Sequence, residues 1–259
     1  MDQQQLFSDP PAPTRVRFTT PVDLGTGDCG QIATGFDGCD YVIKDQSIHH
    51  AIPHAEWFCS ELGELVGVAA PTHKIIAMPD GSTAFGSRWA GGALSPDGAA
   101  PWWERVKAGE IDLSDLGRTL SRIYALDQFV RNLDRHAANV LVHKQHHGHS
   151  VLAFDYSQAW TCFGFPLDAP PLPMCRTVEV QRKLSQLWSR PYIDPLEVKS
   201  TCEEIRSIEV GSIVRIISSH PPIWLDESEK AAILNWWGSD DMNRRLDDII
   251  QGVENGDYL

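Results

Sequence analysis

The spacing of apolar residues divides the chain into a first part that is rich in strands and a second part that is rich in helices. Between residues 16 and 44, short apolar runs alternate with glycines and turn residues, and Asp37-Gly38 is a strong hairpin signal. Two further strands are expected over residues 71–78 and from Thr83 onward. Apolar residues recur with helical spacing over 51–67, 114–130, 178–190, 195–209, 211–219, 226–237 and 240–253. We therefore expect a small β-rich part followed by a mostly helical part.

A hairpin is also expected near the middle of the chain. Two short apolar runs, 139–143 and 151–154, are rich in β-forming residues and flank a polar loop that contains a glycine. In an antiparallel pair the start of the first strand lies beside the end of the second, so Asn139 and Asp155 meet at one end, shortly after Asp134. Carboxylate and carboxamide oxygens suit a hard cation such as Mg²⁺. The other interpretation is an ordinary hairpin with Asp and Asn in its flanking turns.

The residues around this hairpin resemble the catalytic loop of protein-kinase-like enzymes. Asp134-Arg-His-Ala-Ala-Asn139, followed by a hairpin and Asp155, is similar to the Asp-Arg-His variant of HipA-like kinases and phosphoinositide kinases. The resemblance implies that Asp134 accepts the proton of the substrate hydroxyl. It also implies that Asn139 and Asp155 hold Mg²⁺ ions that bridge the phosphates of ATP. His136 is a secondary candidate that could orient the loop or contact phosphate, and a packed structural histidine is the alternative.

A lysine and a glutamate upstream extend the resemblance. The apolar strand 41–44 ends in Lys44 and resembles the kinase strand whose lysine contacts the nucleotide phosphates. The helix that follows could hold a glutamate against this lysine, and the helical wheel alone does not choose among Glu56, Glu61 and Glu64. The HipA-like resemblance favours Glu56, because it stands at the matching distance from the glycine and proline that close the helix. The apolar face of this helix is expected to contain Ala55, Phe58, Leu62, Leu65 and Val66.

Two other segments are candidates for nucleotide contacts. A glycine-rich stretch matches the loop that covers ATP phosphates in many kinases, where absent side chains let backbone N–H groups approach the ligand, although turn chemistry alone would also explain it. Its glycines are Gly25, Gly27 and Gly30. In the resembled fold, the link between two lobes offers backbone groups to the adenine edge. Here that link is expected at Ser87, Arg88, Trp89 and Ala90.

The resemblance implies an α+β, two-lobed protein-kinase-like fold with ATP and Mg²⁺ in the cleft between the lobes. We expect a flexible arm over residues 1–14, a small β-rich N-lobe that binds nucleotide over 15–90, and a helical C-lobe over 91–259. The C-lobe would carry the catalytic loop and the metal site.

The implied reaction is transfer of the γ-phosphoryl group of ATP to a hydroxyl, with Ser or Thr of a protein as the leading acceptor. The Ala-Pro-Glu signature of protein kinases is absent, so a lipid or small-molecule acceptor is the first alternative. A nucleotide-binding pseudokinase or interaction module is the second. Retention of Lys44, Asp134, Asn139 and Asp155 together argues against it, because a binding module has no need of the base.

Composition and charge narrow the class of protein. The chain has 259 residues, 42% of them hydrophobic and 22% charged, which is typical of a globular protein rather than a disordered one. A net charge of −13 opposes nucleic acid or an anionic membrane as a direct partner, because both would be repelled at long range. No apolar run reaches membrane-spanning length and no signal-peptide pattern is present, so we expect a cytoplasmic protein. The six cysteines lack metal-binding spacing and are expected to be buried reduced thiols.

Overall fold

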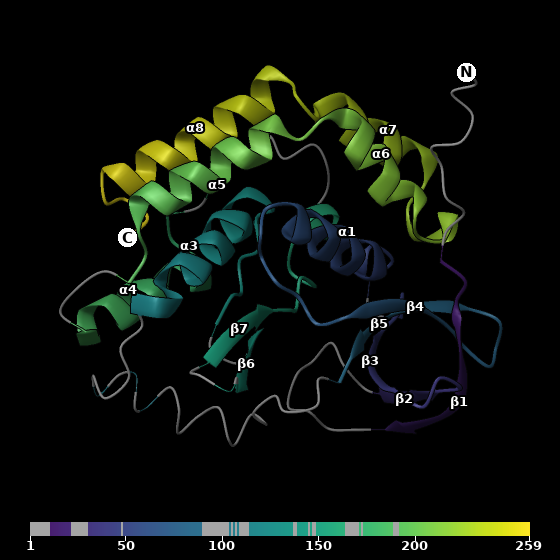
Figure 1. Ribbon diagram of the computed structural model, residues 1–259. Helices are drawn as coiled ribbons and strands as arrows, with labels where there is room; N and C mark the ends of the chain where they lie inside the picture. Colours follow the sequence, from purple (N-terminus) through teal and green to yellow (C-terminus); the bar gives the residue numbers. More distant parts are fainter. Residues whose placement is uncertain are drawn as a thin grey trace.

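The computed structural model has strands in its first part and mainly helices in the rest, as the apolar spacing predicts (Figure 1). The structure describes residues 11–21, 31–47, 49–89, 104, 106, 108, 114–136, 139–144, 146, 149–163, 171, 173–188 and 192–259. The mixture of strands and helices agrees with the expected α+β class. The expected boundary near residue 90 lies at the edge of the described residues and stays a prediction.

Five short strands close into a barrel with the order β1-β2-β3-β5-β4. The strands are β1 (Thr14–Pro21), β2 (Gln31–Gly35), β3 (Asp40–Lys44), β4 (His73–Ala77) and β5 (Thr83–Arg88). The pair β1 and β4 is parallel and closes the barrel through Thr14 and Arg15, whereas the other pairs are antiparallel. The predicted turn at Asp37-Gly38 is confirmed, since Gly38 has a φ of 77°, which glycine adopts without steric cost.

The interior of the barrel is narrow. Its buried apolar side chains are Ala33, Tyr41, Ile43, Ile76 and Ala84. Gly86 on β5 approaches β4 so closely that a Cβ atom at this position would collide with the side chain of Ile76. The Tyr41 hydroxyl donates a 2.6 Å hydrogen bond to Asp37 in the β2–β3 turn. These contacts fix β3, the strand that ends at Lys44.

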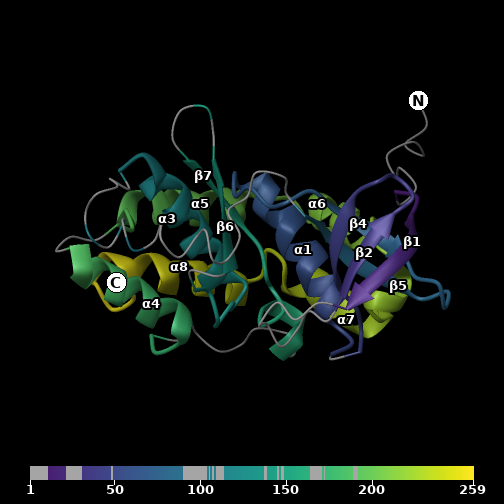
Figure 2. The ribbon, with the colours of Figure 1, turned by 90° about the horizontal axis from the view of Figure 1, so that it is seen from below.

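Helix α1 (Ile52–Leu65) lies between the barrel and the helical part of the molecule (Figures 1 and 2). Pro53 stands in its first turn, and Gly67 follows its end with a φ of 69°. The expectation for Leu65 is wrong, because 51% of this residue is exposed, while the other expected apolar-face residues are buried. Polar residues of α1 are buried as well, since other elements cover the helix on several sides. They are His54, Glu56 and Ser60.

Two side-chain contacts join α1 to the segment that follows helix α6 (Val210–Ser218). His54 Nδ1 lies 2.8 Å from His220 Nε2, and Trp57 Nε1 donates a 2.9 Å hydrogen bond to Ser219 Oγ. Burial lowers the pKa of both histidines, to about 4 for His220, so this pair is neutral near pH 7. The α1 helix is therefore attached to residues far along the chain as well as to the barrel beside it.

Further helices pack around α1 and around a hairpin, and together they contain the main apolar core. The helices are α3 (Ser114–Phe129), α4 (Arg176–Trp188), α5 (Pro195–Ser207), α7 (Glu227–Trp236) and α8 (Asp240–Glu254), and the short 3₁₀ segments are η3 (Trp160–Phe163) and η4 (Pro222–Trp224). Helix α5 packs on α3 and on α8, as Figure 1 shows. A capping box of Asp226 and Glu229 starts α7, where acidic first-turn residues are predicted. None of the helices that the structure describes is long and apolar enough to cross a membrane.

The predicted hairpin consists of β6 (Val140–Lys144) and β7 (His149–Ala153). Val140 pairs with Ala153, and the Phe154 N–H donates to the Asn139 carbonyl at 3.4 Å. Asn139 and the residue after Phe154, Asp155, therefore lie at the same end of the hairpin, as the sequence predicts.

The prediction of buried cysteines is wrong at three positions. Cys59 and Cys202 are buried in helices, but Cys39, Cys162 and Cys175 are half-buried. These three lie in a turn, a 3₁₀ segment and a loop, where one side of the backbone faces solvent. All five described cysteines are free thiols.

Candidate active site

Three charged side chains from distant parts of the chain meet at one point. The Nζ atom of Lys44 donates to Oε1 of Glu56 at 2.6 Å and to Oδ1 of Asp155 at 2.5 Å. The three side chains are 8%, 2% and 13% exposed, so the cluster is almost entirely enclosed. It joins the end of β3, the first half of α1 and the segment that follows the hairpin.

The structure also separates the three candidate glutamates. Glu56 faces Lys44, whereas Glu61 accepts a 2.9 Å hydrogen bond from His73 on β4. Glu64 is exposed at the end of α1. The contact of Glu56 with Lys44 agrees with the choice that the HipA-like resemblance favours. The helical wheel alone left the three glutamates equivalent.

Asp155 occupies an unusual backbone conformation, with a φ of 67° in the left-handed region. A non-glycine residue there costs about 1–3 kcal/mol unless neighbouring contacts offset it. The Ser157 hydroxyl donates to Asp155 Oδ1 at 2.7 Å, and the Tyr156 N–H donates to Glu56 Oε1 at 2.9 Å. These bonds turn the chain so that the Asp155 carboxylate points at Lys44.

Burial and the mutual charges set the protonation of the cluster. Burial opposes the charged form of Lys44, but the two adjacent carboxylates outweigh it and raise the pKa of the lysine above its ordinary value. Burial likewise raises the pKa of Asp155, but the charge of Lys44 and its hydrogen bond outweigh this effect and lower that pKa to about 2. For Glu56 burial dominates and raises the pKa. Near neutral pH the site holds a lysine cation and an Asp155 anion.

Asp134, in the loop that the sequence predicts to be catalytic, is partly exposed and forms an ion pair that the sequence did not predict. Its Oδ1 accepts a 2.7 Å hydrogen bond from Nη1 of Arg176, the first residue of α4. Its Oδ2 lies 3.9 Å from Nε2 of His136. The side chain of Asn139 turns back to donate to the Asp134 carbonyl at 2.9 Å. The structure thus brings together Asp134, His136 and Asn139, and adds Arg176.

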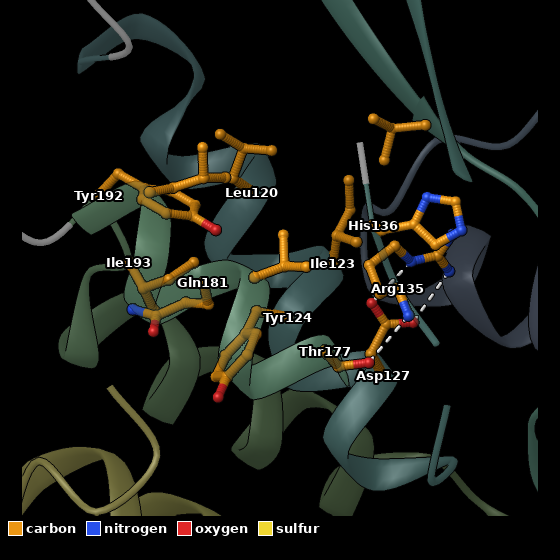
Figure 3. A pocket seen from close by; sticks show the side chains of 13 residues that line it. Leu120, Ile123, Tyr124, Asp127, Arg135, His136, Thr177, Gln181, Tyr192 and Ile193 are labelled. Carbon is orange, nitrogen blue, oxygen red and sulfur yellow. Dashed lines mark hydrogen bonds and ion pairs between the residues drawn. The ribbon is translucent and has the colours of Figure 1, made fainter. Parts of the chain in front are cut away.

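A buried ion pair supports the catalytic loop from the other side. Arg135 donates through Nε and Nη2 to both carboxylate oxygens of Asp127 on α3, at 2.8 and 2.9 Å (Figure 3). Its Nη1 donates to the carbonyls of Asn139 and Phe154, so one guanidinium joins the two segments that lead to the hairpin. The ring of Tyr156 lies against the same guanidinium, 4.8 Å from ring centroid to Cζ. In the sequence, the only sign of this ion pair is Asp127, an acidic residue on the apolar face of a predicted helix.

A cavity of about 50 Å³ lies next to this ion pair, between α3 and α4. Figure 3 shows Asp127 and Arg135 at one end of it and Tyr192 and Ile193 at the other. Most of the remaining lining is apolar; it includes the secondary candidate His136 but not Lys44, Asp134 or Asp155. The Lys44–Glu56–Asp155 cluster and Asp134 therefore lie outside this cavity.

The donor atoms at the hairpin end fit a hard divalent cation. In the part of the chain that the structure describes, no donor contacts Oδ2 of Asp155 or Oδ1 of Asn139. Both oxygens are therefore available as ligands, and carboxylate plus carboxamide is an oxygen set that Mg²⁺ accepts. No group of three or more His, Cys, Asp or Glu residues with metal-site spacing occurs among the described residues. A metal at this site would complete its coordination with water or phosphate oxygens.

The expected adenine link is described only in part. Ser87 and Arg88 end β5, and the Trp89 N–H donates to the Asp40 carbonyl at 2.8 Å. Trp89 is 45% exposed. Four further nucleotide-contact candidates lie outside the described residues, and they are Gly25, Gly27, Gly30 and Ala90.

A model of a protein family described as HipA-like kinase matches residues 30–249. The chain belongs to the HipA-like kinase family. The match covers the barrel from β2 onward, the Lys44–Glu56–Asp155 cluster, the catalytic loop and the C-terminal helices up to α8. A kinase activity follows from this membership, and the charged cluster described above lies in the matched region. No curated protein matches the sequence itself.

The fold of this HipA-like kinase is similar to that of a solved kinase structure. The Helicobacter pylori proinflammatory kinase CtkA matches with a TM-score of 0.56 and 12% identity, over 90% of this chain and 92% of that one. A chain of the Shewanella oneidensis MR-1 complex of HipA, HipB and operator DNA matches with a TM-score of 0.46 and 10% identity, over 98% and 67% of the two chains. A Golgi casein kinase with Mn and ADP bound gives 0.45 and 10%, over 96% and 74%. The likeness to CtkA concerns the fold alone.

Proposed function

We propose that this HipA-like kinase transfers the γ-phosphoryl group of ATP, in the presence of Mg²⁺, to a Ser or Thr hydroxyl of a protein. The observation that carries the proposal is the contact of Lys44 with both Glu56 and Asp155, at one end of a hairpin that also carries Asn139. The nucleotide would bind between a β-rich lobe that includes the barrel and a helical lobe that includes the catalytic loop.

Lys44, Glu56 and Asp134 would have separate roles in the reaction. Lys44, held by Glu56, would contact the nucleotide phosphates and balance their charge. Asp134 would accept the proton of the acceptor hydroxyl as that oxygen attacks the γ-phosphorus. Catalysis would come mainly from positioning and from stabilisation of charge, because phosphoryl transfer needs little covalent help from the protein.

Asp155 and Asn139 would hold Mg²⁺, which would neutralise charge on the nucleotide phosphates. His136 would orient the loop or contact phosphate. Backbone groups from Ser87 to Ala90 would meet the adenine edge, and backbone N–H groups at the glycine-rich loop would meet the phosphates. The glycines of that loop are Gly25, Gly27 and Gly30.

The test is incubation of purified protein with labelled ATP and Mg²⁺, with and without added protein substrates, followed by intact mass and peptide mapping. Three variants run beside it: Asp155→Ala, Asp134→Asn, and Asp241→Asn as a control for loss of one exposed carboxylate. Phosphate on Ser or Thr in the wild type and in Asp241→Asn supports the proposal. We expect Asp155→Ala to be inactive and Asp134→Asn to be slower by about 10²–10⁴ with nucleotide binding retained.

Three results would redirect the proposal. Transfer to a lipid or small hydroxyl compound, but not to protein, would keep the kinase activity and replace the acceptor. Binding of nucleotide without any transfer would make the protein a pseudokinase. Equal rates in Asp134→Asn and the wild type would remove Asp134 from the role of base.

A further inference from the structure

Arg176 contacts the carboxylate to which the proposed function assigns the acceptor proton, and nothing in the family resemblance accounts for it. Its guanidinium lies 2.7 Å from Oδ1 of Asp134, and the two side chains are 57% and 36% exposed. The pair connects residues that are 42 positions apart in the sequence. An exposed ion pair contributes little to stability, so stability does not explain this contact.

The position of Arg176 in its helix also points to a specific purpose. Arg176 is the first residue of α4, where the helix dipole favours a negative charge and opposes a cation. The first turn of α4 otherwise follows that preference, because it carries Glu179. The Asp134 carboxylate, 2.7 Å from the guanidinium, offsets the unfavourable interaction of this cation with the helix dipole.

The residue after Arg176 fixes the start of α4 to the catalytic loop on both sides of Asp134. The hydroxyl of Thr177 donates to the Asn132 carbonyl at 2.6 Å and accepts from the Arg135 N–H at 2.9 Å. Its own N–H donates to the Leu133 carbonyl at 3.3 Å. Thr177 is 2% exposed, so the backbone beside Arg176 is held firmly while the arginine side chain reaches outward to Asp134.

The two oxygens of the Asp134 carboxylate are consequently in different surroundings. Oδ1 accepts a hydrogen bond from Arg176, whereas Nε2 of His136 lies 3.9 Å from Oδ2, beyond hydrogen-bond distance. A carboxylate that is held through one oxygen can present the other oxygen to a hydroxyl in a defined direction and accept its proton.

We propose that Arg176 is a positioning residue for phosphoryl transfer: it holds Oδ1 of Asp134 so that Oδ2 faces the acceptor hydroxyl. The inference rests on the proposed function, in which Asp134 is the base. The acceptor proton moves to Oδ2 as the new O–P bond forms and the bond to the ADP oxygen breaks. Arg176 acts through Asp134 and takes no part in bond making.

The experiment compares Arg176→Ala and Arg176→Lys with the wild type, and uses Lys183→Ala as a control for loss of an exposed cation from the same helix. We expect Arg176→Ala to lower kcat by about 10²-fold, the loss typical of a misplaced reacting group, with the KM for ATP within about twofold. Arg176→Lys should recover part of the rate. Added guanidinium ion, at concentrations that leave the wild type unaffected, should restore activity to Arg176→Ala, which a merely structural role would not permit.

Several results overturn the inference while the proposed function stands. One is an unchanged kcat in Arg176→Ala. Another is a higher kcat in that variant, which would mean that Arg176 inhibits the base. The others are an equal loss of activity in Lys183→Ala and a loss in Arg176→Ala that guanidinium does not rescue. Absence of transfer by the wild type itself would overturn the proposed function, and the role of Arg176 with it.

Discussion

Two arginine–aspartate pairs involve the neighbouring residues Asp134 and Arg135, and they differ in burial. In the pair of Arg135 with Asp127 the side chains are 9% and 0% exposed, and the guanidinium is bonded in addition to two backbone carbonyls. In the pair of Arg176 with Asp134 the corresponding values are 57% and 36%. The buried pair cannot exchange partners without leaving a charge unpaired in the core, whereas the exposed pair can share its charges with a ligand.

The difference shows how one short loop serves two purposes. Asp134 and Arg135 are neighbours in the sequence, yet the Asp134 side chain is partly exposed and the Arg135 side chain is buried in the core. The cluster of Lys44 with Asp155 is intermediate, with exposures of 8% and 13%. We expect the loss of stability on breaking each pair to follow this order of burial.

The largest effect is expected for Arg135→Met. It leaves the Asp127 carboxylate buried without a cation and removes the hydrogen bonds to the Asn139 and Phe154 carbonyls. We expect the free energy of unfolding to fall by about 3–5 kcal/mol, as measured by urea denaturation. The matched control is Arg118→Met, because the Arg118 side chain is 72% exposed in its pair with Glu197. Equal losses in the two variants would contradict the comparison.

An intermediate effect is expected for Asp155, and it depends on pH. Its pKa is about 2 in the fold against 3.8 ordinarily, so the folded state favours the anion. The resulting stabilisation is complete above about pH 4 and is lost as the pH falls toward 2. It amounts to about 2 kcal/mol. Asp155→Asn should lose correspondingly less stability than the wild type between pH 4 and pH 2 in urea denaturation, and parallel curves would refute the assignment.

The smallest effect on stability is expected for Arg176→Ala. Both side chains of this pair are more than one-third exposed, so the change in unfolding free energy should stay within about 0.5 kcal/mol. The same variant is expected to lose most of its activity. Thermal unfolding of this variant beside Arg135→Met would show the separation directly, and a loss above about 2 kcal/mol would place Arg176 among the structural residues instead.

Local patterns in the sequence predicted the parts of the fold that short segments determine. The turn at Asp37-Gly38, the hairpin that brings Asn139 to Asp155, and most helix bounds follow from turn chemistry and apolar spacing. The pairing of Glu56 with Lys44 was chosen through the family resemblance, because spacing alone left three glutamates equivalent. The roles assigned to these residues remain proposals.

Features that depend on distant contacts were not predictable in the same way. The parallel pairing of β1 with β4 closes the barrel, but no local signal marks it. In the sequence, Arg176 cannot be distinguished from the other arginines, and only the fold places it beside Asp134. The exposure of Leu65 was missed because a helical wheel shows which residues share a face, not which neighbours cover the end of that face.

The attachment of α1 to residues 219 and 220 has a consequence for how the protein is made. The contacts of Trp57 and His54 with those residues span 162 and 166 positions in the sequence. Contacts of such separation form late, since loop closure must precede them, and a chain leaving the ribosome cannot form them until the later residues emerge. Glu56 lies between these two anchors. We therefore expect the nascent chain to complete its barrel early but to assemble the Lys44–Glu56–Asp155 cluster only near the end of synthesis, so that ribosome-bound intermediates would have no competent active site.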